Sequence, residues 1–139
     1  MSKIGVLLSI KPIFAWKILS GEKKFEYRKT IPSLFEGMDV FLYATDPVRK
    51  IVGEFKIKRV IKGTPEEVWE KTCEESGVSR SFFFSYFRGR KVSYAIEICS
   101  VKRYSHPLKL SSVRAGLIPP RSFAYIDLLD IQKIRKQSG

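Results

Sequence analysis

The segment Gly21–Lys29, GEKKFEYRK, brings together a lysine, a glutamate and an arginine that could meet one ligand. Lys23 offers a point charge, and Arg28 offers a planar fork of donors that suits a phosphate or a base edge. Glu26 can accept from an exocyclic amine or hold Arg28 in position. The alternative is an exposed strand face, on which each ion pair contributes only ~0–1 kcal/mol.

Alternating side chains predict that this segment is a β-strand. Phe25 and Tyr27 alternate with Lys24, Glu26 and Arg28, and a period of two places the two sets on opposite faces. We expect the aromatic pair to face the core. The charged set then shares the other face, where Glu26 and Arg28 can touch the same ligand.

Two further cations lie at expected turns. Lys11 directly precedes Pro12, at the predicted start of a helix, where free backbone amides favour an anion. An ordinary loop lysine explains this position equally well. Arg121 follows a double proline, which is a rigid turn that either holds Arg121 at the rim of a groove or simply closes the fold.

The net charge points to an anionic partner. The chain has 26 Lys and Arg against 14 Asp and Glu, a formal charge of +12 and a pI near 9.9. This excess does not help folding, but it attracts phosphates and anionic surfaces. The candidates for salt-sensitive phosphate contacts are Lys56, Lys58, Arg88, Arg90 and Lys91. A generally basic proteome is the alternative explanation.

An aromatic cluster, FFFSYF at Phe82–Phe87, directly precedes the basic run RGRK. Aromatic rings beside arginine can stack single-stranded bases. A helix that faces the core explains most of the cluster better, so any exposed member is of interest.

Histidine and cysteine offer little chemistry. His106 is the only histidine, and we expect it in a loop, where it supports neither a Cys/His dyad nor a metal cluster. Cys73 and Cys99 are too few and too far apart for a zinc site. We expect no metal, no cofactor and no required disulfide, which fits a cytoplasmic protein.

Apolar patterns and turn residues define the remaining elements. Strands are predicted at residues 4–10, 24–28, 40–44, 51–61 and 92–98. Helices are predicted at residues 12–20, 64–76 and 79–88, each ended by a glycine. Thr64 and Glu67 form a capping box. Residues 118–126 form a rigid turn and a short apolar segment. A basic C-terminal tail, which we expect to be helical or frayed, begins at about residue 131.

This order of elements lacks the regular crossover helices of a doubly wound parallel sheet. We therefore expect a single α+β domain over residues 1–139, built on a small, curved, mostly antiparallel β-barrel with flanking short helices. The longest apolar run, Ile4–Ile10, is far shorter than the ~20 residues of a membrane span. We interpret it as a first strand rather than a signal peptide, and we expect no membrane partner.

Three stretches together carry a family resemblance. LLSIKPIFAWKILSGEKKFEYRK, at residues 7–29, contains an apolar strand, a short helix and a GxKxxExR motif. The later stretches are YFRGRKVSYAIEI at residues 86–98 and PPRSFAYI at residues 119–126. The sequence resembles the activating-signal-cointegrator homology (ASCH) family in its stand-alone form. The resemblance implies a PUA-like barrel and RNA binding in translation-related or coactivator settings, although some members are hydrolases.

The leading interpretation is a non-enzymatic RNA-binding module whose basic cleft is centred on the GxKxxExR motif. The rival is a small hydrolase of acylated nucleosides or RNA, with Lys23 and Glu26 as its acid–base groups. One amidohydrolase branch of the family uses a lysine, a threonine nucleophile and a glutamate. The resemblance maps that lysine onto Lys23 but that threonine onto Glu26, which cannot serve as a hydroxyl nucleophile.

Other points stay open. The glutamate of the amidohydrolase branch could correspond to Glu66, Glu67, Glu70, Glu74 or Glu75. A protein-interaction domain for an acidic partner is a third possibility. The oligomeric state and the RNA sequence recognised are not specified by these patterns.

Overall fold

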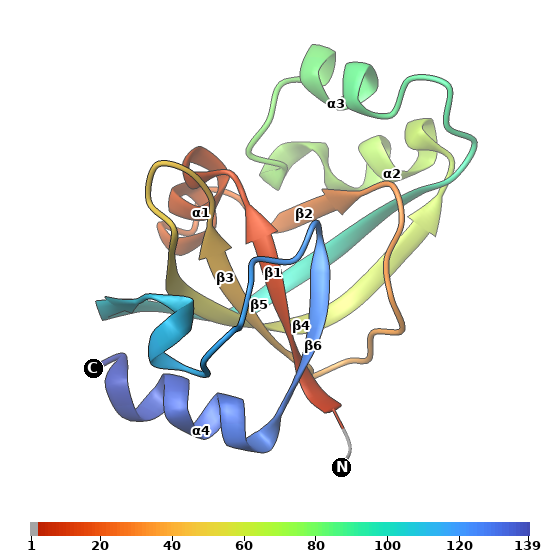
Figure 1. Cartoon of the computed structure of the whole chain (residues 1–139). Coiled ribbons are helices and arrows are strands. Elements are labelled where there is room, and N and C mark those ends of the chain that lie inside the picture. The colour runs from red at the N-terminus through yellow and green to blue at the C-terminus, as the bar shows by residue number, and fades with distance from the viewer. Residues whose placement is uncertain (1–2) are drawn as a thin grey trace.

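The computed structural model describes residues 3–139 as a curved sheet with short helices packed around it (Figure 1). The strands are β1 (Lys3–Ile10), β2 (Phe25–Arg28), β3 (Asp39–Ala44), β4 (Lys50–Gly63), β5 (Ser93–Leu108) and β6 (Phe123–Asp127). The helices are α1 (Pro12–Leu19), α2 (Pro65–Thr72), α3 (Arg80–Tyr86) and α4 (Leu128–Gln137), with 3₁₀ turns η1 (Cys73–Glu75) and η2 (Leu110–Ser112). No helix in the described range is long and apolar enough to cross a membrane.

The six strands form one sheet in the order β2-β5-β4-β3-β1-β6. Only β1 and β3 run parallel; every other neighbouring pair is antiparallel. The predicted α+β class with a mostly antiparallel, curved sheet is therefore confirmed.

The expected closure into a barrel is wrong. The ladder ends at β2, which pairs with β5, and at β6, which pairs with β1. Both edge strands are short, and no ladder joins them in the part of the chain described here. The gap between the two edges is bridged instead by a side-chain hydrogen bond from Arg28 to Ser122.

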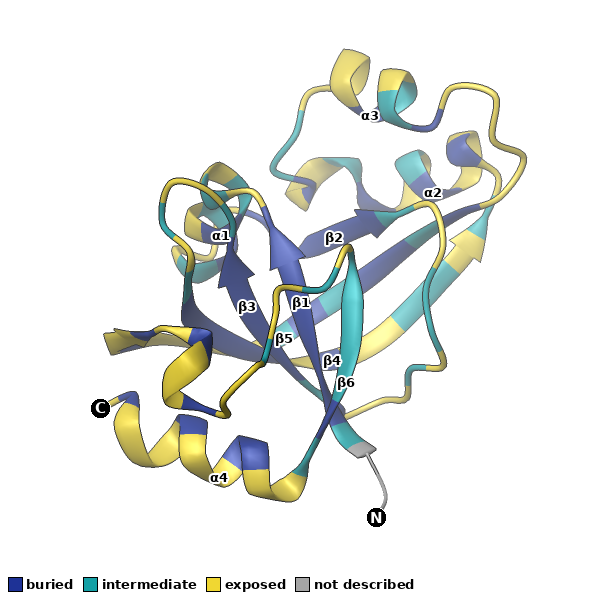
Figure 2. Ribbon diagram, in the orientation of Figure 1, coloured by how far each residue is buried: buried dark blue, intermediate teal, exposed yellow. Residues whose placement is uncertain are grey.

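Buried residues lie mainly along the strands (Figure 2). Among them, the apolar side chains form a core with three parts. The largest lies inside the curve of the sheet and includes Phe55, Ile57, Ile96 and Ile98. A second part lies under α4, and a third joins β2 to α2 and α3. Phe25 and Tyr27 belong to this third part, so the alternation predicted their burial correctly but they do not join the main cluster.

Local sequence signals set the helix boundaries. Pro12 begins α1, and Gly21 follows its end with a φ of 85°. The capping box forms as predicted, because Thr64 accepts from the Glu67 amide while the Glu67 carboxylate accepts from the Thr64 amide. The chain leaves α2 earlier than expected, at Thr72, and continues as the 3₁₀ turn η1.

Two expectations about the second half of the chain need correction. The strand predicted at 92–98 continues to Leu108, so His106 lies exposed on β5 rather than in a loop. Val92, expected in the core, is exposed just before that strand. Residues from about 131, expected as a helical or frayed basic tail, are helical. They form most of α4, which buries Ile131 and Ile134 against the sheet because its apolar residues recur at helical spacing.

Candidate functional site

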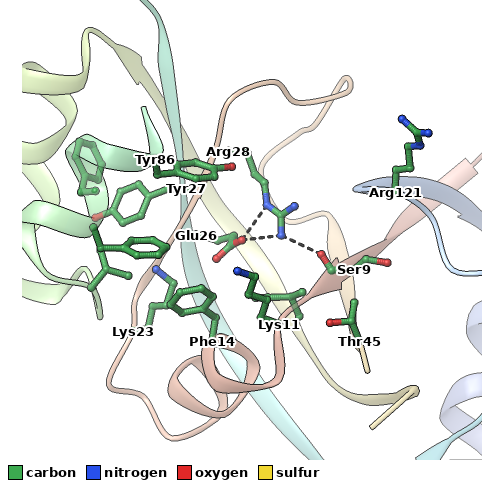
Figure 3. Close-up of a pocket in the computed structure, with 14 residues that line it drawn as sticks. Ser9, Lys11, Phe14, Lys23, Glu26, Tyr27, Arg28, Thr45, Tyr86 and Arg121 are labelled. Carbon is green, nitrogen blue, oxygen red and sulfur yellow. Dashed lines mark hydrogen bonds and ion pairs between the residues drawn. The ribbon is translucent and has the colours of Figure 1, made fainter. Parts of the chain in front are cut away.

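A cavity of about 360 Å³ opens where the end of β1, the start of α1, strand β2 and helix α3 meet (Figure 3). Its lining residues come from six separate parts of the chain and are Ser9, Ile10, Lys11, Phe14, Lys23, Glu26, Tyr27, Arg28, Thr45, Val78, Phe82, Phe83, Tyr86 and Arg121. The fold thus brings together Lys11, the motif residues Lys23, Glu26 and Arg28, and Arg121.

Lys23 lies at the buried end of this cavity with only 2% of its surface exposed. Its Nζ donates to the carbonyl oxygen of Ser76 at 2.8 Å and lies 4.6 Å from the centre of the Tyr27 ring. Burial lowers the pKa of Lys23 from 10.5 to about 8, although the charge of Glu26 opposes this shift. Lys23 can therefore exchange a proton at a pH only slightly above neutral. Groups with such shifted pKa values occur preferentially at functional sites.

Gly77 makes room for Lys23. A Cβ atom added at Gly77 would come within 2.5 Å of Lys23 Cβ and 2.7 Å of Lys23 Cγ. Gly77 also has a φ of 69°, in the left-handed region that other residues rarely adopt. The sequence indicated only a helix end here, because nothing local reveals that this glycine packs on a lysine 54 positions earlier.

Glu26 and Arg28 form a tight pair across the strand face. The Arg28 Nε and Nη2 atoms both approach Glu26 Oε2, each at 2.8 Å. Glu26 Oε1 has no hydrogen-bond partner among the described residues. Every side-chain N or O atom that is fully buried in the described structure does have a partner, so Oε1 is not fully buried. Oε1 is therefore accessible from the cavity, and Glu26 can accept a ligand's proton or hydrogen bond without releasing Arg28.

Arg28 uses most of its donors inside the protein. Nη1 donates to Ser122 Oγ at 3.1 Å, and Nη2 donates to the carbonyl oxygen of Ser9 at 3.0 Å. With Nε bound to Glu26, one N–H of Nη1 is left for a ligand. The geometry favours Arg28 as a positioning residue, and its predicted direct contact with phosphate or a base stays a prediction.

The polar face predicted for β2 needs one correction. Glu26 and Arg28 face the cavity, but the Lys24 side chain pairs with Glu75 at 3.3 Å and is exposed. Lys23, one residue earlier and outside the strand, takes the buried place instead.

Aromatic rings form the apolar wall of the cavity. Phe83 and Phe87 are buried as expected for a core-facing helix. Phe82 is 41% exposed, and its ring lies 5.4 Å from Phe14 and parallel to the ring of Tyr86. Phe82, Phe14 and Tyr86 are therefore available to contact a flat ligand.

Two further cations, Lys11 and Arg121, line the cavity. Lys11 and Arg121 are exposed, and neither has a carboxylate within 4.0 Å in the described structure. Figure 3 shows the Arg121 side chain apart from the other lining residues, beyond Ser9. Thr45, which no sequence pattern indicated, adds a hydroxyl group to the lining.

The other predicted cations lie outside this cavity. Lys56 and Lys58 project from β4 and pair with Asp39 at 2.7 Å and Glu97 at 3.6 Å. Arg88, Arg90 and Lys91 lie exposed in the turn between α3 and β5. No group of three His, Cys, Asp or Glu residues suited to a metal ion occurs within residues 3–139, and Cys73 and Cys99 are free.

Comparison with known proteins identifies close structural and sequence relatives. The sequence profile of the ASCH domain matches residues 8–113. A Zymomonas mobilis protein named "ASCH domain-containing ribonuclease" is 27% identical over 134 residues, which cover 92% of this chain and 88% of that protein.

Solved structures agree with the fold. The crystal structure of ASCH from Zymomonas mobilis aligns with a TM-score of 0.93 at 25% identity, over 99% of this chain and 98% of that one. The N-terminal domain of Staphylothermus marinus McrB aligns with a TM-score of 0.65 at 14% identity, over 98% of each chain, and resembles this chain in fold alone.

Proposed function

The chain belongs to the ASCH domain family, and we propose that it binds single-stranded RNA by seating one unstacked nucleotide in the cavity around Lys23 and Glu26. One observation carries the proposal: a buried lysine and a carboxylate lie at the base of an aromatic-walled cavity on a basic protein.

The chemistry of the cavity suits a nucleobase. Its volume of about 360 Å³ falls in the range of small-ligand sites. Phe14, Phe82 and Tyr86 offer faces or edges for stacking, which favours unpaired bases over duplex. At the polar end, Glu26 Oε1 accepts from a base N–H while the Lys23 ammonium donates to a neighbouring base acceptor.

The unpaired cations in the lining of the cavity suit the phosphates on either side of that nucleotide. Lys11 and Arg121 carry uncompensated charge there. Lys56 and Lys58, in contrast, already face carboxylates, so they contribute only to the diffuse attraction of the basic surface. Binding is therefore expected to weaken by one or more orders of magnitude between ~50 and ~200 mM salt.

The test is fluorescence anisotropy of a labelled single-stranded RNA at low salt with two matched variants. Phe82→Ala removes an exposed ring from the cavity wall, and Ile13→Ala removes an exposed apolar side chain outside it. We expect Phe82→Ala to weaken binding roughly tenfold or more, as stacked bases show on alanine substitution, and Ile13→Ala to leave it unchanged. Undetectable binding by the unmodified protein at low salt, or equal effects of the two variants, would contradict the proposal.

A second function, cleavage of the bound RNA, is supported by the Lys23–Glu26 arrangement and by the ribonuclease name of the Zymomonas relative. In this scheme Glu26 Oε1 takes the proton of a ribose 2′-hydroxyl, and the 2′-oxygen attacks the adjacent phosphorus. The bond from phosphorus to the 5′-oxygen breaks, and Lys23 protonates that oxygen. The products carry a 2′,3′-cyclic phosphate and a 5′-hydroxyl.

Replacement of one ribose by deoxyribose distinguishes cleavage from binding. A single 2′-deoxy substitution at the cleaved position should abolish the cut there without abolishing binding. Glu26→Gln should not cut RNA, because the amide cannot accept the proton. It should still bind RNA through the stacking and phosphate contacts, although more weakly, because the amide NH2 cannot accept from the base N–H. Cleavage by Glu26→Gln at the rate of the unmodified protein would exclude Glu26 as the base.

A further inference from the structure

A second hollow, of about 370 Å³, lies beside the cavity. It forms where the chain leaves β2, at the end of β4 and in the turn from α3 into β5. Its lining residues are Lys29, Thr30, Lys62, Gly89, Arg90, Lys91, Val92 and Tyr94. The pairing of Gly63 with Ser93 fixes the β4 and β5 parts side by side.

The charge of this hollow is all of one sign. Four of its lining side chains are cationic and none is acidic. Within the described structure, none of these four has a carboxylate within 4.0 Å, whereas Lys56 and Lys58 on β4 each have one. Such an uncompensated cluster attracts anions, and the Thr30 hydroxyl adds a neutral donor.

Two of these cations lie over tyrosine rings. Lys29 Nζ lies 4.8 Å from the centre of the Tyr86 ring, and Lys62 Nζ lies 6.0 Å from the centre of the Tyr94 ring. A ring face attracts a cation without neutralising it. The ammonium groups therefore keep their charge for a ligand.

The hollow adjoins the cavity across Lys29 and Tyr86. Arg28 and Tyr86 line the cavity, and Lys29, the next residue after Arg28, lies on the Tyr86 ring and lines the hollow. A chain of nucleotides that leaves the cavity past Tyr86 reaches the hollow at once.

We propose that this hollow binds the phosphodiester backbone of the RNA strand that continues from the cavity. The inference rests on the proposed function, because it extends the same RNA beyond the seated nucleotide. A single strand is the expected ligand, since an unstacked base in the cavity requires an unpaired neighbour. Backbone contacts of this kind position the strand and carry no sequence information.

Two double variants with equal loss of charge test the inference. Lys62→Ala/Lys91→Ala removes two cations from the hollow, and Lys56→Ala/Lys58→Ala removes two exposed, paired cations from the middle of β4. The probes are a labelled oligouridylate of about ten nucleotides and uridine 5′-monophosphate. Affinities are measured across a salt series, and circular dichroism checks that both proteins are folded.

The hollow variant should bind the oligouridylate at least tenfold more weakly at ~50 mM salt. Its plot of log affinity against log salt should become shallower by about 1.4, the slope of two single-strand phosphate contacts at ~0.7 each. The β4 variant should change affinity less than threefold, and the mononucleotide should bind all three proteins alike. Equal effects of the two variants on the oligouridylate would overturn this inference and leave the cavity proposal standing.

Two other outcomes are equally decisive. Failure of the unmodified protein to bind any single-stranded RNA at low salt would overturn the proposed function itself. If a poly-glutamate peptide bound and lost affinity only in the hollow variant, while the oligouridylate bound all proteins alike, the hollow would be a protein-docking surface and the inference would be wrong.

Discussion

Arg28 donates through Nη1 to Ser122 Oγ at 3.1 Å, and this bond joins the two free edges of the sheet. Arg28 ends β2 at one edge, and Ser122 directly precedes β6 at the other. The Ser122 carbonyl oxygen also accepts from the Ser9 amide at 2.9 Å, next to the Ser9 carbonyl that Arg28 binds. The sheet stays open, and this side-chain hydrogen bond bridges its two edges beside the cavity.

Loss of Arg28 should therefore destabilise the fold as well as the site. Arg28→Ala leaves the buried Glu26 carboxylate without its cation, so we expect a loss of ~3 kcal/mol in the free energy of unfolding, measured by urea denaturation. Arg28→Lys should recover only part of this, because a point charge cannot reach Glu26, Ser9 and Ser122 together.

A second substitution at Glu26 tests whether its unpaired carboxylate causes the instability of the Arg28→Ala protein. Glu26→Gln should be nearly neutral alone, because the amide oxygen can still accept from Arg28, but it should stabilise the Arg28→Ala protein by ~1 kcal/mol or more. Lys58→Ala, which breaks an exposed pair with Glu97, should cost less than ~0.5 kcal/mol. If Glu26→Gln destabilised the Arg28→Ala protein instead, the unpaired Glu26 carboxylate would not be the cause of the stability lost with Arg28.

Stability should rise with pH above neutrality because of Lys23. Its pKa is about 8 in the folded protein and 10.5 when exposed, so the unfolded chain binds more protons between these values. The free energy of unfolding then increases with pH across that interval, by ~2 kcal/mol between about pH 7.5 and 9.5.

The difference between the unmodified protein and Lys23→Met isolates this effect, since methionine keeps the length and apolar character of the side chain without titrating. Urea denaturation of both proteins at each pH gives the difference directly. If this difference stayed constant from about pH 7.5 to 9.5, the pKa of Lys23 would be the same in the folded and the unfolded protein, contrary to the prediction.

Helix α4 should contribute to the core rather than behave as a tail. Ile134→Ala truncates a side chain that is 1% exposed and leaves a cavity in the core, so we expect a loss of ~2–4 kcal/mol in the free energy of unfolding. Leu129→Ala, on the same helix but 52% exposed, should change stability by less than ~0.5 kcal/mol. Equal, small effects in thermal unfolding would show that α4 does not pack on the sheet.

Local patterns predicted the elements well because their causes are local. Alternation at Phe25 and Tyr27 marked β2, and Thr64 with Glu67 marked the start of α2. The same patterns could not predict the length of β5 past Ile98, since Ser100 has a positive φ and the residues beyond it lose the alternation.

The site was harder to predict because its parts meet only in the fold. The types and spacing of Lys23, Glu26 and Arg28 indicated one ligand, and the three do line one cavity. However, Lys23 is buried by Ser76 and Gly77, and Arg28 is held by Ser122, 94 positions away. No periodicity in the sequence reports such contacts.

Gly77 allows the sharpest test of how Lys23 is positioned. Gly77→Ala forces a left-handed backbone to carry a Cβ atom, at ~1 kcal/mol, and drives that atom into the Lys23 side chain. Gly116 has a similar φ of 80° but nothing within 4 Å of an added Cβ, so Gly116→Ala carries the backbone cost alone. We expect a loss of ~1 kcal/mol for Gly116→Ala and at least ~2 kcal/mol more for Gly77→Ala, measured by urea denaturation.

The two glycine variants should also differ in RNA binding and in pH dependence. Displacement of Lys23 by Gly77→Ala moves its ammonium out of the desolvated position, so the rise of stability above pH 8 should shrink toward that of Lys23→Met. The affinity of the Gly77→Ala protein for single-stranded RNA should fall as well. The Gly116→Ala protein should keep both the RNA affinity and the pH dependence of the unmodified protein. If Gly77→Ala lost stability but kept the affinity and pH dependence of the unmodified protein, the position of Lys23 would matter for the core and not for the ligand.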